Sequence, residues 1–374
     1  MSAPPATDVL IVGSGVIGLS LAWELAQRGL RVRVLESGQV GRATSWAGAG
    51  ILPPAAKYGA NDAYDQLKSL SHALHPDWAA RLQEKTGIDT GFQKCGGLYL
   101  ARTKAEAATL VASQFWWQEH GIEFHRWSPE ELMRHEPALA ALVPQLKSAW
   151  FLPEEYQLRN PRHLKALAAA CSLAGVELIE ETPVDEVLIG PSGVASLRAG
   201  DEVFQADQLC LCSGPWARMT LEQMGISTGM MPVRGQIVMY RCQTPPISRV
   251  VNEGNRYLVA RGDGRILAGS IEEEVGFRIE TTSEGIRQIR NWAEGVLPLL
   301  QQTPVEKSWA GLRPGSFDGW PYMGKIATTE NLFVAAGHYR AGIHLSCGTA
   351  VLMADLMLGH PTSIDLNPFR PGRG

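Results

Sequence analysis

The segment DVLIVGSGVIGLSLAWELAQRGLRVRVLES, residues 8–37, decides the fold of this 374-residue chain. The apolar run VLIV at its start is typical of a buried parallel strand, and apolar residues then recur at helical spacing as far as Gly29. A second strand, RVRVLE, ends at Glu36. This order of strand, helix and strand predicts the first unit of a Rossmann-like α/β domain with a parallel sheet.

Three glycines between the first strand and the helix predict a dinucleotide site. Gly13 permits the tight turn, Gly15 lets the backbone approach a pyrophosphate, and Gly18 lets the helix pack against the strand. The helix then begins at Val16 and Ile17, where free N–H groups and the positive end of the helix dipole face the phosphates. A lone glycine motif is a weak signal, but here every neighbouring element is present in the expected order.

The acid and the loop that follow the second strand discriminate among dinucleotides. Glu36 can accept hydrogen bonds from both ribose hydroxyls of an adenosine, which disfavours a 2′-phosphate and therefore NADP. The loop SGQVGRATSWAGAGILPP, residues 37–54, replaces the helix and strand of a simple NAD domain. Such a loop suits a flavin, whose ribityl chain and ring extend beyond the first nucleotide. The loop residues by themselves leave an ordinary glycine-rich loop open.

The rest of the chain alternates between this fold and another. Helix and strand patterns after residue 160 resume the dinucleotide-type fold, whereas GQIVMYR, RYLVAR and GRILAGS predict a second, mainly antiparallel sheet. The first domain is therefore expected to be discontinuous. We expect a Rossmann-like FAD-binding domain formed by residues 1–90, 151–225 and 311–374, and an α+β substrate domain formed by residues 91–150 and 226–310.

Composition disfavours several classes of function. The chain is 45% hydrophobic and 19% charged with a formal net charge of −4, so neither nucleic acid nor an anionic membrane is expected as a partner. The apolar run from Val9 to Ala26 is interrupted by glycines and a glutamate, and the first residues lack the basic start of a secretory signal. Cys210 and Cys212 form C-x-C, which is neither a zinc nor a redox motif. We expect reduced cysteines, no metal and a cytoplasmic protein.

Two arginines near the C-terminus lie in glycine-rich loops, a pattern that suggests backbone pressed against a ligand. Arg313 lies in SWAGLRPGSFDGWPYMG and Arg340 in AAGHYRAGIHLS, just before a helix expected from about Gly342 to Leu358. For Arg313 alone, an ion pair with Asp318 is the competing interpretation. The acidic run at residues 272–274 is typical of a solvated turn.

These motifs, in this order, resemble the D-amino acid oxidase family of flavoproteins from Asp8 to about Leu358. VGSGVIGLSLAWELAQRG is shared by many flavoproteins, whereas GRATSWAGAGIL, GLRPGSFDGWPYMG and GHYRAGIHLS are more specific. Within the family they are most similar to the bacterial enzymes that oxidise glycine for the thiazole of thiamine. The resemblance implies FAD bound in extended form and without a covalent bond, because Cys347 does not match the cysteine that attaches FAD in sarcosine oxidases.

The resemblance also implies roles for individual residues. Arg313 would pair with the substrate carboxylate, Arg340 would line the substrate site, and Tyr257 would hydrogen-bond the substrate. For Tyr257 the competing interpretation is core packing with its hydroxyl at the surface. Asn255 replaces a histidine that relatives can carry, which bears on substrate preference. Together with the glycine motif, FAD contacts are expected at Gly13, Gly15, Val16, Ile17, Gly18, Glu36, Ser37, Arg42, Thr44, Ser45, Ala49, Gly50, Ile51, Val184, Ser213, Gly214, Trp216, Gly337, His338, Arg340, Gly342 and Ile343.

The implied reaction is FAD-dependent oxidative deamination of glycine and other small amino acids of the sarcosine, D-alanine and D-proline type. A hydride passes to the flavin, the imine hydrolyses to a 2-oxo acid, and molecular oxygen is reduced to hydrogen peroxide. A homo-oligomer is implied by the resemblance alone. Three alternatives stay open: a D-amino acid or D-imino acid dehydrogenase with a non-oxygen acceptor, a sarcosine-oxidase-like enzyme, and an NAD-binding dehydrogenase or a flavin-binding protein without turnover.

Overall fold

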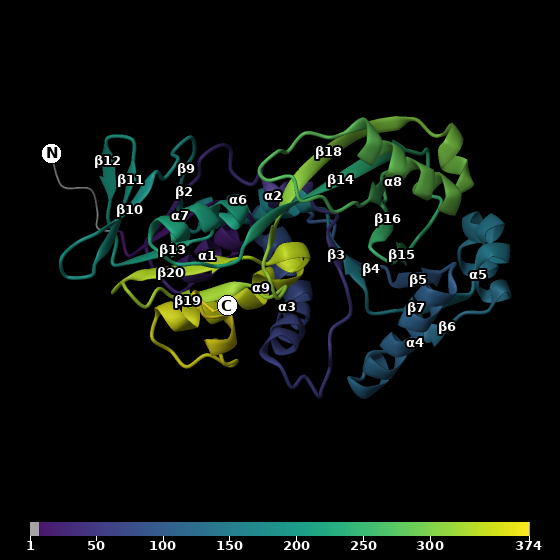
Figure 1. The fold of residues 1–374 in the computed structure, drawn as a ribbon, viewed down its shortest axis with the longest axis horizontal. Helices are drawn as coiled ribbons and strands as arrows, with labels where there is room; N and C mark the ends of the chain where they lie inside the picture. The colour runs from purple at the N-terminus through teal and green to yellow at the C-terminus, as the bar shows by residue number, and fades with distance from the viewer. Residues whose placement is uncertain (1–6, 374) are drawn as a thin grey trace.

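The structure is a computed structural model that describes residues 7–373. Two large sheets lie side by side along its long axis (Figure 1). The first consists, in spatial order, of β19 (Tyr322–Lys325), β20 (Leu332–Ala336), β13 (Gln208–Leu211), β1 (Val9–Val12), β2 (Val32–Leu35) and β9 (Glu177–Ile179). The second consists of β18 (Val305–Gly315), β14 (Met231–Arg241), β17 (Arg265–Gly269), β16 (Arg256–Ala260), β15 (Val250–Glu253), β5 (Gly97–Ala101), β7 (Ser148–Leu152) and β6 (His125–Arg126). The predicted α/β fold with a second, mainly antiparallel sheet is confirmed.

The first sheet is built around β1 and is parallel except at its edge strand β19, which pairs antiparallel with β20. β1 pairs in parallel with both β2 and β13, and β13 pairs in parallel with β20. Val9, Leu10 and Ile11 are each 2% exposed or less, because both faces of the sheet are covered. The carboxyl ends of β1, β2 and β13 therefore lie at one edge, which is where α/β sheets bind ligands.

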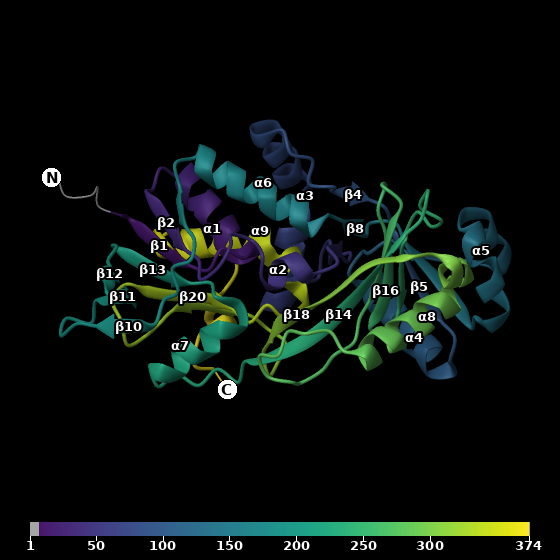
Figure 2. The same ribbon diagram turned by 90° about the horizontal axis from the view of Figure 1, so that it is seen from above.

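Helices cover one face of the first sheet, and a mixed layer covers the other (Figure 2). α1 (Val16–Gln27) packs against α6 (Asn160–Leu173) and α9 (Gly342–Met357), and α3 (Ala63–Thr86) packs against α6 and α9. On the opposite face, Leu221 of α7 (Ala217–Gln223) and Leu197 of β11 (Ala195–Ala199) are buried against the sheet. Within residues 7–373, no helix combines the length and apolar character needed to cross a membrane.

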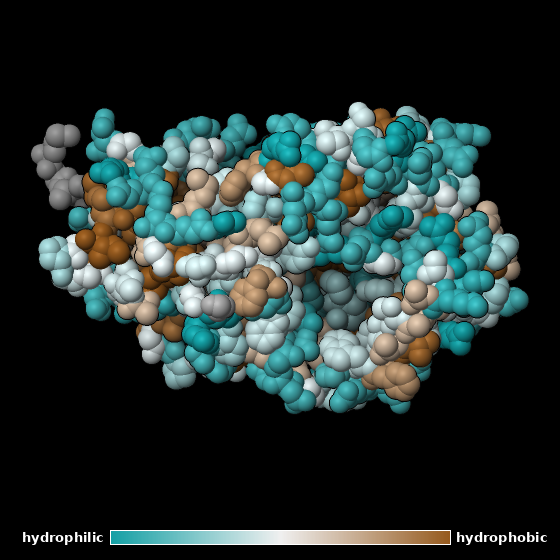
Figure 3. All heavy atoms as spheres, viewed as in Figure 1, coloured by the Kyte–Doolittle hydropathy of each residue, from teal (hydrophilic) through white to brown (hydrophobic). Residues whose placement is uncertain are grey.

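An antiparallel meander forms one end of the molecule. It consists of β10 (Glu186–Ile189), β11 and β12 (Glu202–Phe204). Its inner side contributes Leu197 to the core, whereas Ile189, Val194 and Val203 are exposed. Figure 3 shows apolar surface at this end of the molecule.

The second sheet has a covered face and a face turned toward the first domain. Trp292 and Val296 of α8 (Ser283–Val296) are buried against Val238 and Tyr240 of β14. α5 (Pro129–His135) and α4 (Lys104–Glu119) flank the far end of the sheet. On the other face, Ile237 and its neighbours pack against Ala49, from the loop that follows β2. That face therefore meets the segment expected to hold a flavin.

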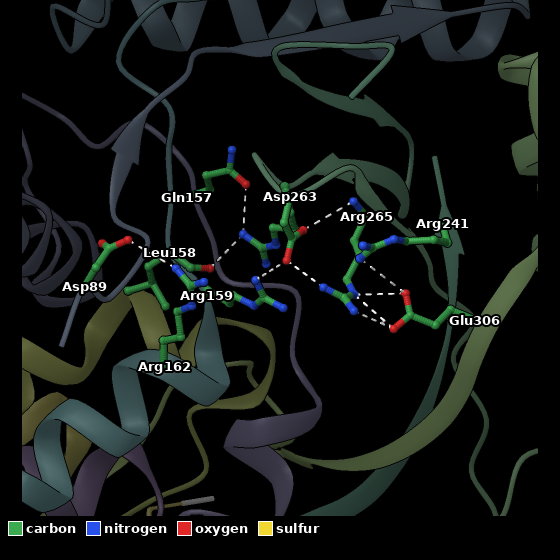
Figure 4. Close-up of polar contacts among 10 residues, drawn as sticks. Asp89, Gln157, Leu158, Arg159, Arg162, Arg241, Asp263, Arg265 and Glu306 are labelled. Atoms are coloured by element: carbon green, nitrogen blue, oxygen red, sulfur yellow. Dashed lines mark hydrogen bonds and ion pairs between the residues drawn. The ribbon is translucent and has the colours of Figure 1, made fainter. Parts of the chain in front are cut away.

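Ion pairs tie elements of the two halves together (Figure 4). Arg159, just before α6, pairs with Asp263 at 2.6 Å, and Asp263 also pairs with Arg265 of β17 at 2.7 Å. Burial alone would raise the pKa of Asp263, but hydrogen bonds from Arg159 and Arg265 lower it to about 2. Arg265 pairs in turn with Glu306 of β18 at 2.6 Å. The expected division into domains stays a prediction, and β18 crosses its boundary at residue 311.

Candidate active site

The turn between β1 and α1 has the backbone geometry that its glycines predict. Gly13 has a φ of +99°, a value that favours glycine. A Cβ at Gly18 would collide with the carbonyl oxygen of Gly13, so the helix can approach the turn only if residue 18 lacks a side chain. A Cβ at Gly15 would lie 3.2 Å from Ser45 Oγ. Gly13 and Gly18 thus shape the turn, and Gly15, which has no side chain, leaves the backbone of the turn accessible to a ligand.

Glu36, at the end of β2, is held by local hydrogen bonds. Ser14 donates to Glu36 Oε2 through its backbone nitrogen at 2.8 Å and its hydroxyl at 2.7 Å. The hydroxyl of Ser37 and the backbone nitrogen of Gly38 both donate to Oε1 at 3.1 Å. The carboxylate is therefore ordered, and a ribose hydroxyl would bind it by replacing one of the two serine hydroxyls.

A first cavity of about 510 Å³ opens at this edge of the parallel sheet. Residues at the carboxyl ends of β1, β2, β13 and β20 and in the turns after them line this cavity, which is called the first cavity below. The predicted residues that line it are Gly13, Gly15, Val16, Ile17, Glu36, Ser37, Thr44, Ser45, Val184, Ser213, Gly214, Trp216, Gly337, His338, Arg340, Gly342 and Ile343. The hydroxyl of Ser213 is buried there without a hydrogen-bond partner among the described residues, as expected where a polar ligand supplies one. Cavity, glycine turn and orphaned hydroxyl fit a dinucleotide such as FAD.

A second cavity of about 520 Å³ lies between the loop after β2 and the open face of the second sheet. Ala49, Gly50, Ile51 and Tyr257 line it. Both cavities are lined by Thr44, Gly48, Arg313, Arg340 and Ile343, so they meet at a common junction. The structure thus brings the predicted cofactor residues and the three predicted substrate residues to adjoining spaces.

Arg313 lies at this junction and forms no ion pair with any residue that the structure describes. It lies on β18 next to Gly235 of β14, where a Cβ would collide with the guanidinium group. Nη1 donates to the carbonyl oxygen of Ile271 at 3.2 Å and Nη2 to the hydroxyl of Ser270, so its partners among residues 7–373 are neutral. Burial lowers the pKa of this guanidinium. A buried cation with neutral partners is suited to bind an anionic group.

The alternative ion pair between Arg313 and Asp318 is wrong. Asp318 pairs with Arg373 at 3.0 Å, and that arginine also donates to the carbonyl oxygen of Trp320 at 2.8 Å. The glycine–proline loop after β18 is therefore held by Arg373, which leaves Arg313 directed toward the cavities.

Tyr257 lies on β16 opposite Gly269 of β17. A Cβ at Gly269 would collide with the phenol ring, so the ring lies flat across that position. The side chain is half-buried and lines the second cavity, which does not fit the interpretation that its hydroxyl lies at the protein surface. Burial raises the pKa of Tyr257, while the charge of Arg313 acts in the opposite direction. Tyr257 is therefore a neutral hydroxyl group near a cation.

Arg340 differs from Arg313 because it has a carboxylate partner. Its Nη1 donates to Glu272 Oε1 at 3.2 Å, and Nη2 donates to the carbonyl oxygen of Asn255 at 3.1 Å. Tyr339, which has a φ of +46°, also donates to Glu272 at 2.7 Å. Glu272 is exposed, as expected for this acidic turn, but it is also ion-paired, and Glu273 pairs with the buried Arg234 at 2.9 Å.

Three predicted cofactor residues contribute differently from the rest. Gly18 lies beneath the turn and Arg42 is exposed; neither lines a cavity. The ring of His338 is buried and shares a hydrogen bond with Thr349 at 3.1 Å, and burial lowers its pKa to about 3. It therefore lines the first cavity as a neutral residue whose ring is occupied elsewhere.

Residues remote in sequence hold the loop that separates the two cavities. Its central turn is α2 (Thr44–Ala47), and it runs on into β3 (Ile51–Leu52), which pairs with β8 (Tyr156–Gln157) and, through β8, with β4 (Gln93–Lys94). The contacts are Asn160 Nδ2 to Ser45 O at 2.7 Å, Trp309 Nε1 to Ala47 O at 3.0 Å, Arg261 Nη2 to Ala49 O at 2.6 Å and Thr44 Oγ1 to Leu312 O at 2.8 Å. Asn160, Trp309 and Arg261 were not among the residues expected from the sequence.

Some of the residues that were not expected carry a local sequence signal, and others do not. Gly235 and Gly269 interrupt strand-like runs, which marks a close approach of another group. Asn160 and Arg261 carry no such signal, because their partners are backbone carbonyls more than a hundred residues away.

Comparisons with known proteins agree with this geometry. The family model for FAD dependent oxidoreductases, DAO, matches residues 8–356. Glycine oxidase of Geobacillus kaustophilus is 36% identical and covers 97% of this chain and 96% of its own. Glycine oxidase of Pseudomonas aeruginosa is 34% identical, with 97% and 98% covered. The crystal structure of the Geobacillus enzyme superposes with a TM-score of 0.93 at 35% identity over 98% of both chains.

Proposed function

This chain belongs to the DAO family of FAD-dependent oxidoreductases, and from that premise we propose that it is an amino acid oxidase acting on glycine and other small amino acids. The observation that carries the proposal is the junction of the two cavities, where Arg313 is buried with only neutral partners among residues 7–373. Relatives named glycine oxidase align with this chain nearly end to end, and sarcosine, D-alanine and D-proline are proposed as further substrates.

FAD is the cofactor, and the first cavity offers the residues that would hold it. The turn at Gly13 and Gly15 would receive the diphosphate, Glu36 the adenosine ribose, and the loop at Gly337 the ring system. When bound, FAD accepts a hydride from the substrate α-carbon and passes the electrons to an acceptor. We propose that the binding is non-covalent, because the Cys347 thiol is buried in α9 next to His75.

The chain's own residues orient the substrate and exclude water. Arg313 would bind the carboxylate through two parallel N–H donors, a geometry that fixes both position and orientation. Tyr257 would donate its hydroxyl to the same carboxylate, and Arg340 would close the junction while Glu272 balances its charge. Desolvation beside these cations favours the neutral form of the substrate amine, which is the reactive form.

The remaining parts of the proposal concern the acceptor and the setting. We propose molecular oxygen as acceptor with hydrogen peroxide as product, and a place in thiamine biosynthesis, since relatives named bifunctional protein ThiO/ThiG match 98% of this chain. A cytoplasmic location is proposed because all six cysteines are free. A homo-oligomer is proposed on family membership alone.

One spectroscopic experiment tests the function. The purified protein should be yellow, and glycine added without air should bleach the visible flavin absorbance. Admitting air should restore the colour and release peroxide in proportion to the glycine consumed. Absence of bleaching with glycine, sarcosine, D-alanine and D-proline would contradict the proposal. Bleaching that air does not reverse would favour a dehydrogenase with another acceptor.

A further inference from the structure

Glu155 is a buried carboxyl group directly behind the wall of the second cavity. It lies between β7 and β8 and is 0% exposed. Tyr99 of β5 donates its hydroxyl to Oε2, and Asn252 of β15 donates its amide nitrogen to Oε1 at 3.0 Å. Tyr99 and Asn252 themselves line the second cavity. One carboxyl group thus holds two polar side chains of the cavity wall.

The backbone around Glu155 is built to admit this carboxyl group. Tyr99 and Asn252 lie opposite each other where β5 and β15 pair in parallel. A Cβ at Gly97 would collide with the carboxyl group, so a glycine is required there. The carbonyl oxygen of Glu155 also accepts a hydrogen bond from the backbone nitrogen of Gly96 at 2.9 Å. Glu155 is thus held both through its carboxyl group and through its main chain.

The described chain gives Glu155 no counter-charge. Lys57 and Lys94 pair with its neighbour Glu154, at 2.9 Å and 3.9 Å. Arg261 donates instead to Gln157, Leu158 and Ala49. Among the described residues, the titratable groups that face Glu155 are Tyr99 and the thiol of Cys95. Burial, and then the charge of Glu155, raises the pKa of the Cys95 thiol to about 12 and raises that of Tyr99 as well.

The environment of Glu155 contrasts with that of Glu253, a buried carboxyl group of β15. Glu253 pairs with Arg102 at 2.6 Å and accepts from Trp292 Nε1 at 2.7 Å. Burial raises the pKa of Glu155 to about 7, although the bonds from Tyr99 and Asn252 act to lower it. An ionisable group buried without a charged partner destabilises the fold and is typical of a functional site.

We propose that Glu155 is a positioning residue that orients Tyr99 and Asn252 to bind the substrate amino group, an inference that rests on the proposed function. Above this pKa the carboxyl group is ionised and only accepts hydrogen bonds, so Tyr99 turns its hydrogen and Asn252 its N–H group toward Glu155. The lone pairs of the Tyr99 hydroxyl and of the Asn252 side-chain oxygen Oδ1 then remain free to accept hydrogen bonds from a ligand in the second cavity. Hydrogen-bond acceptors bind the N–H donors of an amino group, just as the N–H donors of Arg313 bind a carboxylate.

The test compares Glu155→Gln with wild-type holoenzyme. Glutamine donates as well as accepts hydrogen bonds, so it reverses the direction of one of the two bonds. We expect the KM for glycine to rise about 10-fold with kcat changed less than about 3-fold. The Kd of acetate, measured through the flavin spectrum, should change less than about 2-fold because acetate lacks the amino group. The wild-type KM should also titrate near the pKa of Glu155, and that dependence should vanish in the variant.

Two further variants complete the test. Tyr99→Phe removes the hydroxyl that Glu155 orients and should raise the KM for glycine in the same way, whether or not Glu155→Gln folds. Glu253→Gln removes a buried carboxylate outside the cavities and should leave the KM for glycine unchanged, which controls for general damage.

Specific results would overturn the inference. An unchanged KM for glycine in Glu155→Gln or Tyr99→Phe would do so, as would equal weakening of glycine and acetate. If wild-type holoenzyme neither oxidises glycine nor binds acetate, the proposed function fails as well. That result is distinguishable because it concerns the unmodified protein.

Discussion

Arg313 and Arg340 carry the same charge and lie at the same junction, but their partners separate their roles. Arg313 donates to a carbonyl and a hydroxyl oxygen, whereas Arg340 donates to the carboxylate of Glu272. Because a carboxylate partner neutralises one arginine and not the other, Arg313 retains the charge available to a substrate.

At the residue scale, Arg313→Ala should weaken substrate binding and leave FAD bound. Loss of a charge-assisted pair in a buried site should lower kcat/KM for glycine about 100-fold, mainly through KM. Steady-state kinetics measures this, and the flavin absorbance per protein shows whether the cofactor is retained. Arg241→Ala, on the neighbouring strand β14 and outside both cavities, is the control and should be nearly silent.

Gly235→Ala provides a second variant for the same prediction, because the added methyl would displace the guanidinium group without removing its charge. Its KM for glycine should rise as well. Gly262→Ala adds a methyl where nothing lies within 4 Å and serves as its control. A wild-type KM in both Arg313→Ala and Gly235→Ala would contradict the carboxylate assignment.

At the scale of elements, the loop at residues 43–51 is held mainly by contacts from other elements. α6, β18 and Arg261, which directly follows β16, each supply a donor or acceptor to its backbone or to Thr44, while the loop itself contributes the short helix α2. A loop of small residues has high conformational freedom, so these contacts fix the geometry that a flavin would meet.

Asn160→Ala should therefore weaken FAD binding. Asn160 is 0% exposed, and its loss leaves the Ser45 carbonyl oxygen without a donor, at a cost of about 1–3 kcal/mol. We expect the Kd of FAD to rise about 10-fold, which ultrafiltration of the holoenzyme measures. Asn367→Ala, at an exposed position near the C-terminus, should retain its FAD. Equal FAD retention in both variants would show that the hydrogen bond from Asn160 to Ser45 does not shape the FAD site.

At the scale of the whole molecule, buried histidines make the fold sensitive to acid. Burial lowers the pKa of His72 and His75 to about 4 and that of His163 to about 3, and His75 adds to the effect on His163. Unfolding exposes these rings, whose ordinary pKa is about 6.5. Below that pH the unfolded state binds more protons, so stability present above pH 6.5 is lost as pH falls toward the folded-state pKa values.

His163→Leu should reduce this acid sensitivity. Neither ring nitrogen of His163 has a hydrogen-bond partner among the described residues, so leucine removes the titration without breaking a bond. The loss of unfolding free energy between about pH 6.5 and pH 5 should shrink by about 2 kcal/mol. Thermal or urea unfolding at the two pH values measures it, with the exposed His360→Leu as control. Parallel pH curves for His163→Leu and wild type would refute the argument.

Local sequence signals were sufficient to define the fold class and the backbone of the nucleotide turn. The signals are local because burial of a strand, a tight turn and close helix packing each restrict which residues can occupy a position. They are the apolar run VLIV, the glycines and Glu36. The second sheet was also predictable, because its strands alternate with turn residues. Gly235 and Gly269 were visible as interruptions of strands, but their partners Arg313 and Tyr257 were not, since pairing across a sheet depends on register.

The pairing of charges, in contrast, depends on how the chain packs. Arg313 and Asp318 are five residues apart, yet Asp318 binds Arg373, and Arg340 binds Glu272 from a distant loop. The placement of Glu155 behind Tyr99 and Asn252 likewise depends on the parallel pairing of β5 and β15. Local sequence restricts backbone shape, but the electrostatics of a buried group depends on which distant groups share its low-dielectric surroundings, and that is determined only when the chain packs.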